Sequence, residues 1–356
     1  MRILIVNPFG IGDVLFSLPL VRAIRRAMPE AHLEYLCNRR TQELVAHWPE
    51  LDGHLIFEKD EFRAAWRRSK REGTRFLGAF FGSVRGKRFN LLVDLSLGWH
   101  TGLAGLFCGI GRRIGFNYRG RGRFLTASMP LQGFSSQPVA EYYLDLLALA
   151  GIPRSASVSP GLALPETAEE EARNYLRKQG LAADARLAAL VPGGGSSWGP
   201  NAVFKQWPPD RFARLADEIS RRGLQVLLVG DERESPLCKE VSARMQAGTA
   251  RMVRVPSLLL LAGILKRCRI VIGNDGGTMH LATAVEVPTL SIFGPVDARV
   301  YGPYPGGPTH RVVAKILACR PCYRQFRFPP CPWGNICLKQ MEVEQVLSAA
   351  DEILAN

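Results

Sequence analysis

Runs of apolar residues alternate with amphipathic segments along most of the chain. Residues 2–7 form a continuous aliphatic run that predicts a strand, and a glycine-rich turn and a helical segment ending at Met28 follow it. Pro19 interrupts that segment, so the helix either begins late or kinks. Further strands are predicted at 32–37 and 90–95, and a helix at 141–150. Strands that alternate with helices pair in parallel, which predicts a doubly wound α/β sheet.

The same alternation starts again after a break. Residues 152–165 are rich in Gly, Pro, Ser and Ala without periodicity, and we interpret them as a linker. An acidic helix start follows at 165–171, and a later helix is expected to be capped by Asp210 and to end at Gly223. The remaining predictions are strands at 187–191, 225–229, 270–272 and 290–293, and helices at 258–265, 279–285 and 342–354.

Two domains follow from this pattern. We expect Rossmann-like domains at 1–160 and 161–340, with a ligand cleft between them at the carboxyl ends of both sheets. The last helix, within 341–356, is expected to pack towards the N-terminal domain. A chain of 356 residues that is 47% hydrophobic is long and apolar enough for two such cores.

The charge is unusually basic and unevenly distributed. The chain carries a formal net charge of +14, which favours a polyanionic partner such as a nucleic acid, an anionic membrane or a phosphorylated substrate. Residues 61–88 hold nine basic and two acidic residues, and 112–123 hold five arginines and no acid. Residues 311–339 hold six basic residues and no acid, so the rest of the chain is slightly acidic. The protein is therefore nearly neutral outside these three basic regions.

The chain offers no membrane-spanning or secretory signal in its sequence. No run of about 18 apolar residues is present. The apolar run at the N-terminus is too short for a signal peptide and no cleavage site follows it, so we expect a cytoplasmic protein.

Eight cysteines are too few for a disulfide scaffold. Four of them cluster as Cys319-x2-Cys322-x8-Cys331-x5-Cys337. Such a cluster could hold zinc, although a spacing of five in the second pair is unusual. The alternative is a reduced, Pro/Arg-rich loop, and the sequence leaves both interpretations open.

Three glycine-rich loops carry candidate chemistry. The loop 274–280 joins a strand to a helix, where exposed amides suit a diphosphate and Asp275 could accept a sugar hydroxyl. In 193–205, three glycines precede two serines and Lys205, which together could cradle a diphosphate. The turn 10–13 is a weak dinucleotide signal, and Asp13 is either a helix cap or a general base. For the first two loops, an ordinary strand-to-helix turn and a flexible surface loop remain the alternatives.

Taken together, these loops resemble the heptosyltransferase family of bacterial lipopolysaccharide synthesis. The resemblance runs from the first strand to about residue 305, and its most specific part is the run from Asp275 to Ala282. The other matching stretches are 12–15, 18–20, 192–194, 205–208, 230–232, 256–258 and 293–295. The resemblance implies a GT-B fold and an inverting, metal-independent transfer of heptose from ADP-heptose, without a cofactor, to a lipopolysaccharide core or similar anionic glycolipid.

The resemblance also implies roles for individual residues. Asp13 would be the general base, because a carboxylate suits a hydroxyl that loses its proton only in the transition state. The expected donor-binding residues are Ser196, Ser197, Lys205, Glu232, Ser257, Leu258, Asp275, Gly276, Gly277, Thr278, Met279 and His280. The expected acceptor-binding residues are Gly12, Arg63, Arg67 and Lys70.

A phosphorylated lipid acceptor changes the interpretation of residues 61–88. Basic residues interleaved with aromatic ones then favour an interfacial membrane segment over a solvated helix face, so the enzyme would sit peripherally on the inner membrane. A sugar-nucleotide epimerase of related architecture is the first alternative, because it would share the donor loops. A basic nucleic-acid- or membrane-binding protein without catalysis is a more distant one, since no nucleic-acid module is recognisable.

Overall fold

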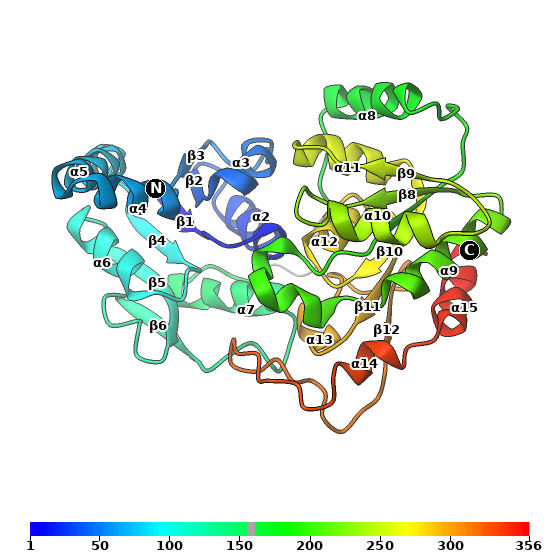
Figure 1. Ribbon diagram of the computed structural model, residues 1–356. Coiled ribbons are helices and arrows are strands. Elements are labelled where there is room, and N and C mark those ends of the chain that lie inside the picture. Colours follow the sequence, from blue (N-terminus) through cyan, green and yellow to red (C-terminus); the bar gives the residue numbers. More distant parts are fainter. Residues whose placement is uncertain (155–160, 356) are drawn as a thin grey trace. The chain divides into compact units, whose positions relative to one another are not determined.

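The computed structural model describes residues 1–154 and 161–355, without the side chains of Ser196 and Ser197. The chain separates into two compact units, Met1–Phe134 with Val139–Ser159 and Ser135–Pro138 with Pro160–Asn356. Each unit contains one six-stranded sheet in which all described strand pairs are parallel (Figure 1). Both halves of the chain therefore have the doubly wound α/β architecture expected from the sequence.

The first sheet has the order β3-β2-β1-β4-β5-β6. Its strands are β1 (Arg2–Val6), β2 (His32–Cys37), β3 (Gly53–Ile56), β4 (Leu91–Asp94), β5 (Arg112–Tyr118) and β6 (Ala127–Leu131). The helices of this unit are α1 (Ile11–Phe16), α2 (Leu18–Ala27), α3 (Arg39–Ala46), α4 (Lys59–Arg68), α5 (Lys70–Gly86), α6 (Trp99–Phe107), α7 (Val139–Asp145) and the 3-10 helix η1 (Leu146–Ala150). The central strands β1 and β4 are almost completely buried because helices cover both faces of a parallel sheet.

The first helical segment is interrupted, as its proline predicts. α1 ends at Phe16 and α2 begins at Leu18, with Pro19 in the first turn of α2, where its missing N–H costs no hydrogen bond. The buried Ser17 hydroxyl lies 2.7 Å from the Val14 carbonyl oxygen and 2.6 Å from the Tyr35 hydroxyl. These contacts satisfy polar groups at the break.

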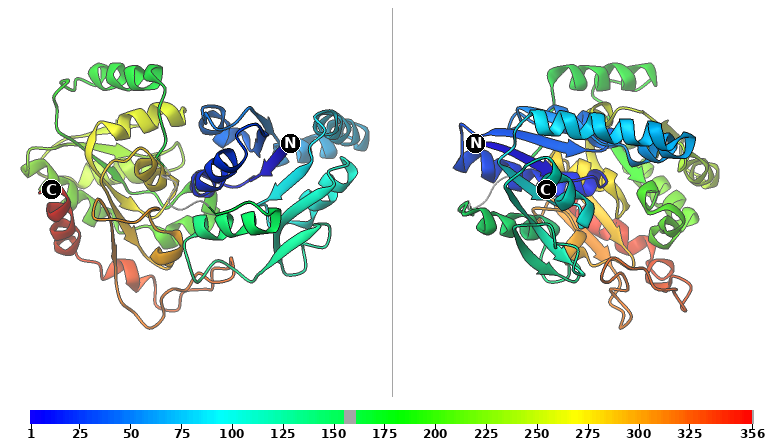
Figure 2. Two further views of the ribbon diagram at one scale, coloured as in Figure 1. Left: turned by 180° about the vertical axis from the view of Figure 1, so that it is seen from behind. Right: turned by 90° about the vertical axis from the view of Figure 1, so that its left-hand side faces the viewer.

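The second sheet has the order β12-β11-β10-β7-β8-β9. Its strands are β7 (Leu187–Val191), β8 (Gln225–Val229), β9 (Ala250–Val253), β10 (Cys268–Asn274), β11 (Thr289–Phe293) and β12 (His310–Ala314). The helices are α8 (Glu166–Lys178), the 3-10 segment η2 (Ser196–Lys205), α9 (Pro209–Arg221), α10 (Ser235–Arg244), α11 (Leu258–Lys266), α12 (Gly277–Ala284), α13 (Ala298–Tyr301), α14 (Ile336–Lys339) and α15 (Val343–Leu354). Helix α8 packs against the outer side of α11 (Figures 1 and 2). Asp210 lies in the first turn of α9, and Pro208, not Asp210, is the residue that precedes this helix.

The C-terminal helix belongs to the second unit. The apolar face of α15 is buried in the same core as α9 and the second sheet, and the two helices lie side by side (Figure 1). The Trp207 indole N–H donates to the Met341 carbonyl oxygen over 2.8 Å and fastens the segment that leads into α15. Its apolar residues therefore complete the core of the second unit.

Among the described residues, no helix combines the length and the apolar character needed to cross a membrane.

Candidate functional site

The two donor-loop candidates leave neighbouring strands of the second sheet. From β7 the chain proceeds outward to β8 and β9, and from β10 it proceeds in the other direction to β11 and β12. The adjacent pair β7 and β10 is therefore the switch point of the sheet, where open α/β sheets bind ligands beyond the carboxyl ends of the strands. The loops at 192–208 and 274–280 both begin there.

A buried asparagine joins these two loops. The Asn274 side-chain amide donates to the Pro192 carbonyl oxygen over 2.7 Å, and the Trp207 backbone N–H donates to the Asn274 side-chain oxygen over 3.0 Å. Asn274 is completely buried, so these bonds satisfy polar groups that water does not reach. The loops are consequently held in a fixed arrangement before any ligand binds.

A buried ion pair lies at the centre of the site. Lys205 Nζ is 2.7 Å from Asp275 Oδ2, and the two side chains are only 3% and 5% exposed. The Lys205 ammonium also lies 4.3 Å from the centroid of the Trp198 ring. The sequence predicted both charged residues for the donor site but not that they would pair.

The neighbouring histidine is neutral near pH 7. His280 Nε2 lies 3.8 Å from Asp275 Oδ1. Burial is the main cause that lowers the pKa of His280 to about 4, and the nearby Lys205 charge acts in the same direction. His280 therefore offers a neutral imidazole at the site.

Packing explains two of the three consecutive glycines. A Cβ on Gly193 would lie 2.0 Å from Glu234 Oε1, and one on Gly194 would lie 2.2 Å from the Ala202 carbonyl oxygen. Only Gly195 has a positive φ, at +84°. A Cβ on Gly276 would lie 3.8 Å from the Gly195 nitrogen, which places the two glycine loops next to each other.

Glu234, which the sequence analysis did not select, is the carboxylate that reaches the glycine loop. Its Oε1 accepts a hydrogen bond from the Gly195 N–H over 3.1 Å, and burial is the main cause that raises its pKa. Asp231 Oδ1 accepts a hydrogen bond from the Glu234 N–H over 3.0 Å. Glu232, the residue expected to hold ribose hydroxyls, is exposed. The two glutamates are two residues apart in sequence, and only the turn before α10 decides which of them faces inward.

The first turn of α12 supplies amides next to the ion pair. Gly277 and Thr278 begin this helix, and the first N–H groups of a helix have no partner within it. Met279 does not fit its expected role, because its N–H donates to the Gly276 carbonyl oxygen and its side chain is buried. The anion-binding capacity of this turn therefore rests on the amides before Met279.

The remaining predicted donor residues lie in different surroundings. Ser257 precedes α11 and its hydroxyl accepts a hydrogen bond from the Leu260 N–H over 2.9 Å, so it caps that helix. Leu258 is the first residue of α11 and is half-buried. Ser196 and Ser197 begin η2, but their side chains lie outside the part of the chain that the structure describes.

In the first unit, two carboxylates follow neighbouring strands of the sheet. β1 and β4 are adjacent and form its switch point. Gly12 and the half-buried Asp13 lie in α1 directly after β1, and the Asn7 side-chain amide donates to the Asp13 carbonyl oxygen over 3.0 Å. Asp94 ends β4, and burial raises its pKa to about 7 although the Ser96 N–H donates to it over 2.8 Å. Asp94 was not among the site residues predicted from the sequence.

The predicted acceptor residues are not all near one another in this unit. Arg63 and Arg67 lie on α4 and Lys70 begins α5, and all three are exposed. Helix α4 follows the edge strand β3, which is two strands from β1 and hence about 10 Å away. These three residues thus form a basic surface apart from the turn that carries Gly12.

The aromatic residues between these arginines pack mostly against one another. The rings of Phe57, Phe62, Phe76 and Phe80 have centroid distances of 4.9 to 6.3 Å. Trp66 is 43% exposed. Most of these rings therefore form the contact between α4 and α5, whereas Trp66 stays at the surface.

Two cations beside a histidine at the carboxyl edge of the first sheet were not foreseen. Partial burial is the main cause that lowers the pKa of His100, and the nearby charges of Lys59 and Arg121 act in the same direction. All three side chains are exposed. They come from segments after β3, β4 and β5, so no local sequence pattern links them.

The comparisons with known proteins agree with this architecture. Residues 77–328, well over half of the chain, match the model of glycosyltransferase family 9 (heptosyltransferase). The chain is 26% identical over 309 residues to lipopolysaccharide heptosyltransferase 2 of Escherichia coli, covering 83% of each chain.

Two solved structures show the same GT-B-like fold. The structure of the E. coli ADP-heptose LPS heptosyltransferase II matches with a TM-score of 0.78 at 21% identity, covering 100% of this chain and 99% of the other. The E. coli heptosyltransferase WaaC with ADP-2-deoxy-2-fluoro heptose matches with a TM-score of 0.70 at 19% identity, covering 99% of each chain. Together with the family match, these findings decide for the transferase over the epimerase and the non-catalytic alternatives. The chain belongs to glycosyltransferase family 9, the heptosyltransferase family.

Proposed function

We propose that this protein transfers a heptose from ADP-heptose, with inversion and without a catalytic metal, to a lipopolysaccharide core or similar anionic glycolipid. The observation that carries the donor assignment is the buried Lys205–Asp275 pair beside the α12 N-terminus at the switch point of the second sheet. The names of the E. coli relatives, which include ADP-heptose and lipopolysaccharide, support the choice of donor and acceptor.

The donor site has the charges that a diphosphate leaving group requires. As the sugar–oxygen bond breaks, negative charge grows on the diphosphate, and fixed donors must stabilise it when no metal does. Lys205 supplies a cation, and Gly277 and Thr278 supply amides at the positive end of α12. Asp275 holds the ammonium in position, so little reorganisation is needed during the reaction. Glu234, rather than Glu232, is the carboxylate we assign to the ribose hydroxyls, because it lies against the glycine loop.

Asp13 is the proposed general base. Inversion requires the acceptor hydroxyl to attack the anomeric carbon in line while a base takes its proton, and the nucleoside diphosphate leaves from the opposite face. Asp13 follows β1 at the switch point of the first sheet and is half-buried, which supports this role. The acceptor is anionic, and the exposed cations Lys59 and Arg121 at the same sheet edge suit it.

The basic surface of α4 and α5 fits a peripheral position on the cytoplasmic face of the inner membrane. Arg63, Arg67 and Lys70 are exposed there, and each such cation near an anionic lipid surface contributes about 1 kcal/mol. A membrane location would bring the enzyme to its lipid acceptor.

Incubation with ADP-heptose and a heptose-deficient lipopolysaccharide tests this function. We expect a glycolipid one heptose heavier by mass spectrometry, with the anomeric configuration inverted by NMR. Asp13→Asn should lower kcat by at least about 100-fold while ADP binding, measured by calorimetry, changes little. Asp210→Asn, an exposed aspartate in the first turn of α9, is the matched control and should keep full activity. An altered free nucleotide sugar without transfer would refute the transferase, and normal turnover of Asp13→Asn would refute only the base.

A further inference from the structure

Three of the four clustered cysteines lie on a long irregular segment that the proposed reaction does not use, and the fourth lies in the helix that follows it. Between β12 and α14, residues 315–335 contain neither a helix nor a strand. Ordered loops of this length are uncommon and usually need a feature that holds them together. The segment contains four prolines, and Cys319, Cys322, Cys331 and Cys337 are spread from its start to the first turn of α14.

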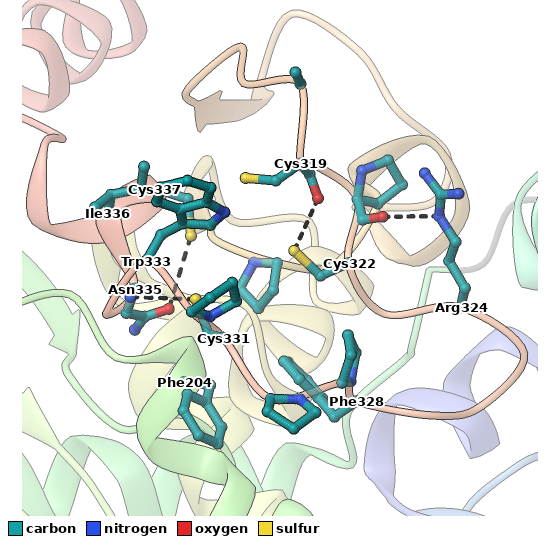
Figure 3. A pocket seen from close by; sticks show the side chains of 16 residues that line it. Phe204, Cys319, Cys322, Arg324, Phe328, Cys331, Trp333, Asn335, Ile336 and Cys337 are labelled. Atoms are coloured by element: carbon teal, nitrogen blue, oxygen red, sulfur yellow. Dashed lines mark hydrogen bonds between the residues drawn. The ribbon is translucent and has the colours of Figure 1, made fainter.

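The four thiols line one cavity. Its volume is about 390 Å³, and Figure 3 shows the sulfur atoms of the four cysteines directed towards the same space. Cys322 Sγ donates to the Cys319 carbonyl oxygen over 2.9 Å, and the Asn335 N–H donates to Cys331 Sγ over 3.4 Å. Cys337 Sγ contacts Asn335 Oδ1 over 3.7 Å. In the described part of the chain, no three His, Cys, Asp or Glu side chains already surround a point at ligand distance. The sulfurs therefore converge without yet forming a coordination sphere.

The charges near the cavity suit a thiolate cluster. The Arg320 guanidinium lies near the thiols of Cys337, Cys322 and Cys319, and it donates to the carbonyl oxygens of Gly294 and Lys315. A dication bound by four thiolates carries a net charge of −2, which an adjacent half-buried arginine offsets. The N–H that Asn335 directs at Cys331 Sγ is a contact that a metal-bound thiolate can keep, since thiolate sulfur remains an acceptor.

We infer that Cys319, Cys322, Cys331 and Cys337 bind one thiophilic metal ion, zinc or iron, as a structural site that holds the segment 315–335 in place. Four thiolates in tetrahedral arrangement, with metal–sulfur distances of about 2.3 Å, are the preferred surroundings of such ions. Each thiol releases its proton as the ion binds, so binding displaces four protons and changes no oxidation state. The thiols of Cys322 and Cys337 have to turn from their oxygen acceptors into the cavity, which is large enough for this rotation.

This segment also supports the wall of the donor site. The Tyr323 and Phe328 rings lie 4.9 and 5.6 Å from the Trp198 ring, and Phe328 stacks on Phe204 at 5.7 Å. Trp198 in turn lies under the Lys205 ammonium. Resting on the proposed function, the metal would act as a positioning element: it fixes the aromatic side chains that hold Trp198 and Lys205 where the diphosphate binds.

Metal analysis of the full chain, purified under reducing conditions without chelator, tests the site. We expect about one zinc or iron per chain by mass spectrometry of the elements, at least a tenfold lower content in Cys322→Ser/Cys331→Ser, and an unchanged content in Cys108→Ser. Cys108 is a buried cysteine of the first unit and serves as the matched control. The proposal would be overturned if the unmodified chain held no more metal than the double variant. It would also be overturned if the intact mass of the unmodified chain showed two disulfides under these conditions.

A second measurement does not depend on the folding of the variants. Protein freed of metal and supplied with Co²⁺ alone should develop the visible bands of tetrahedral cobalt and the thiolate-to-cobalt charge-transfer absorption. An octahedral cobalt spectrum would overturn the site even if the variants failed to fold. We expect ADP affinity to fall about tenfold in the metal-free protein, because small displacements of a binding wall are costly. Unchanged ADP affinity with metal lost would overturn the positioning role alone, whereas failure of the intact protein to bind ADP would refute the proposed function and leave the metal result standing.

Discussion

Removal of the Lys205 ammonium isolates a buried charge. In Lys205→Met the side chain keeps nearly the same length, but Asp275, only 5% exposed, loses the cation that lies 2.7 Å from it. The nearby His280 does not replace that charge near pH 7, because burial lowers its pKa to about 4. Breaking a buried ion pair in this way costs about 3–5 kcal/mol in the free energy of unfolding, which corresponds to a shift of about 10²–10⁴ in the folding equilibrium.

Urea unfolding followed by circular dichroism measures the loss of stability, and ADP titration calorimetry measures the accompanying loss of ADP affinity. Lys205→Met/Asp275→Asn should recover most of the lost stability, because no unpaired charge remains, yet it should bind ADP as weakly as the single variant does. Lys266→Met, which breaks the exposed pair between Lys266 and Glu169 at 2.5 Å, should cost no more than about 1 kcal/mol. A cost of less than 1 kcal/mol for Lys205→Met, or normal ADP affinity in the double variant, would refute the reasoning.

Three further predictions follow from burial and packing at the two switch points. Burial raises the pKa of Asp94 from 3.8 to about 7, so this group makes the folded state about 4 kcal/mol less stable as pH rises from 4 to 7. The urea midpoint of Asp94→Asn should therefore fall less with rising pH than that of the unmodified protein, and an equal pH dependence in the two proteins would refute the prediction. Glu234→Gln should weaken ADP binding about tenfold in calorimetry, because a charge-assisted hydrogen bond to a ribose hydroxyl is lost. Its melting temperature should change little, because the side-chain oxygen can still accept the hydrogen bond from the Gly195 N–H. Normal ADP affinity would show that Glu234 is not part of the donor site. Gly194→Ala should cost about 1–3 kcal/mol in the free energy of unfolding, measured by heat or urea, because its Cβ would lie 2.2 Å from a backbone oxygen. Gly276→Ala should be nearly neutral, because its Cβ meets nothing closer than 3.7 Å. A larger loss of stability in Gly276→Ala than in Gly194→Ala would contradict this packing.

Elements with a strong local pattern could be predicted from the sequence alone. The aliphatic runs of β1, β7 and β8 and the amphipathic α9 are set by residues close together in the chain. The break at Pro19 is also local, because a proline ring excludes the hydrogen bond wherever it occurs. Strand β5 was missed because its sequence is polar and rich in arginine, and only pairing with β4 and β6 makes it a strand.

The candidate donor site was predicted in its parts but not in its arrangement. The glycine loops and the charged residues within them were visible in the sequence, since loops after parallel strands gather at one edge of the sheet. The choice of Glu234 over Glu232 was not visible, because it depends on how the turn before α10 directs each side chain. Met279 likewise looked like part of a binding loop, and helix formation buried it.

By itself, the sequence determined two α/β halves, their basic regions and the loops that carry chemistry, because periodicity, glycine and charge are properties of the chain itself. The tertiary structure alone decided that Lys205 pairs with Asp275, that α15 completes the second core, and that four cysteines share one cavity. Each of these depends on which distant residues become neighbours and lose their water. Burial and pairing then set charge, pKa and reactivity, and neither can be obtained from the order of residues along the chain.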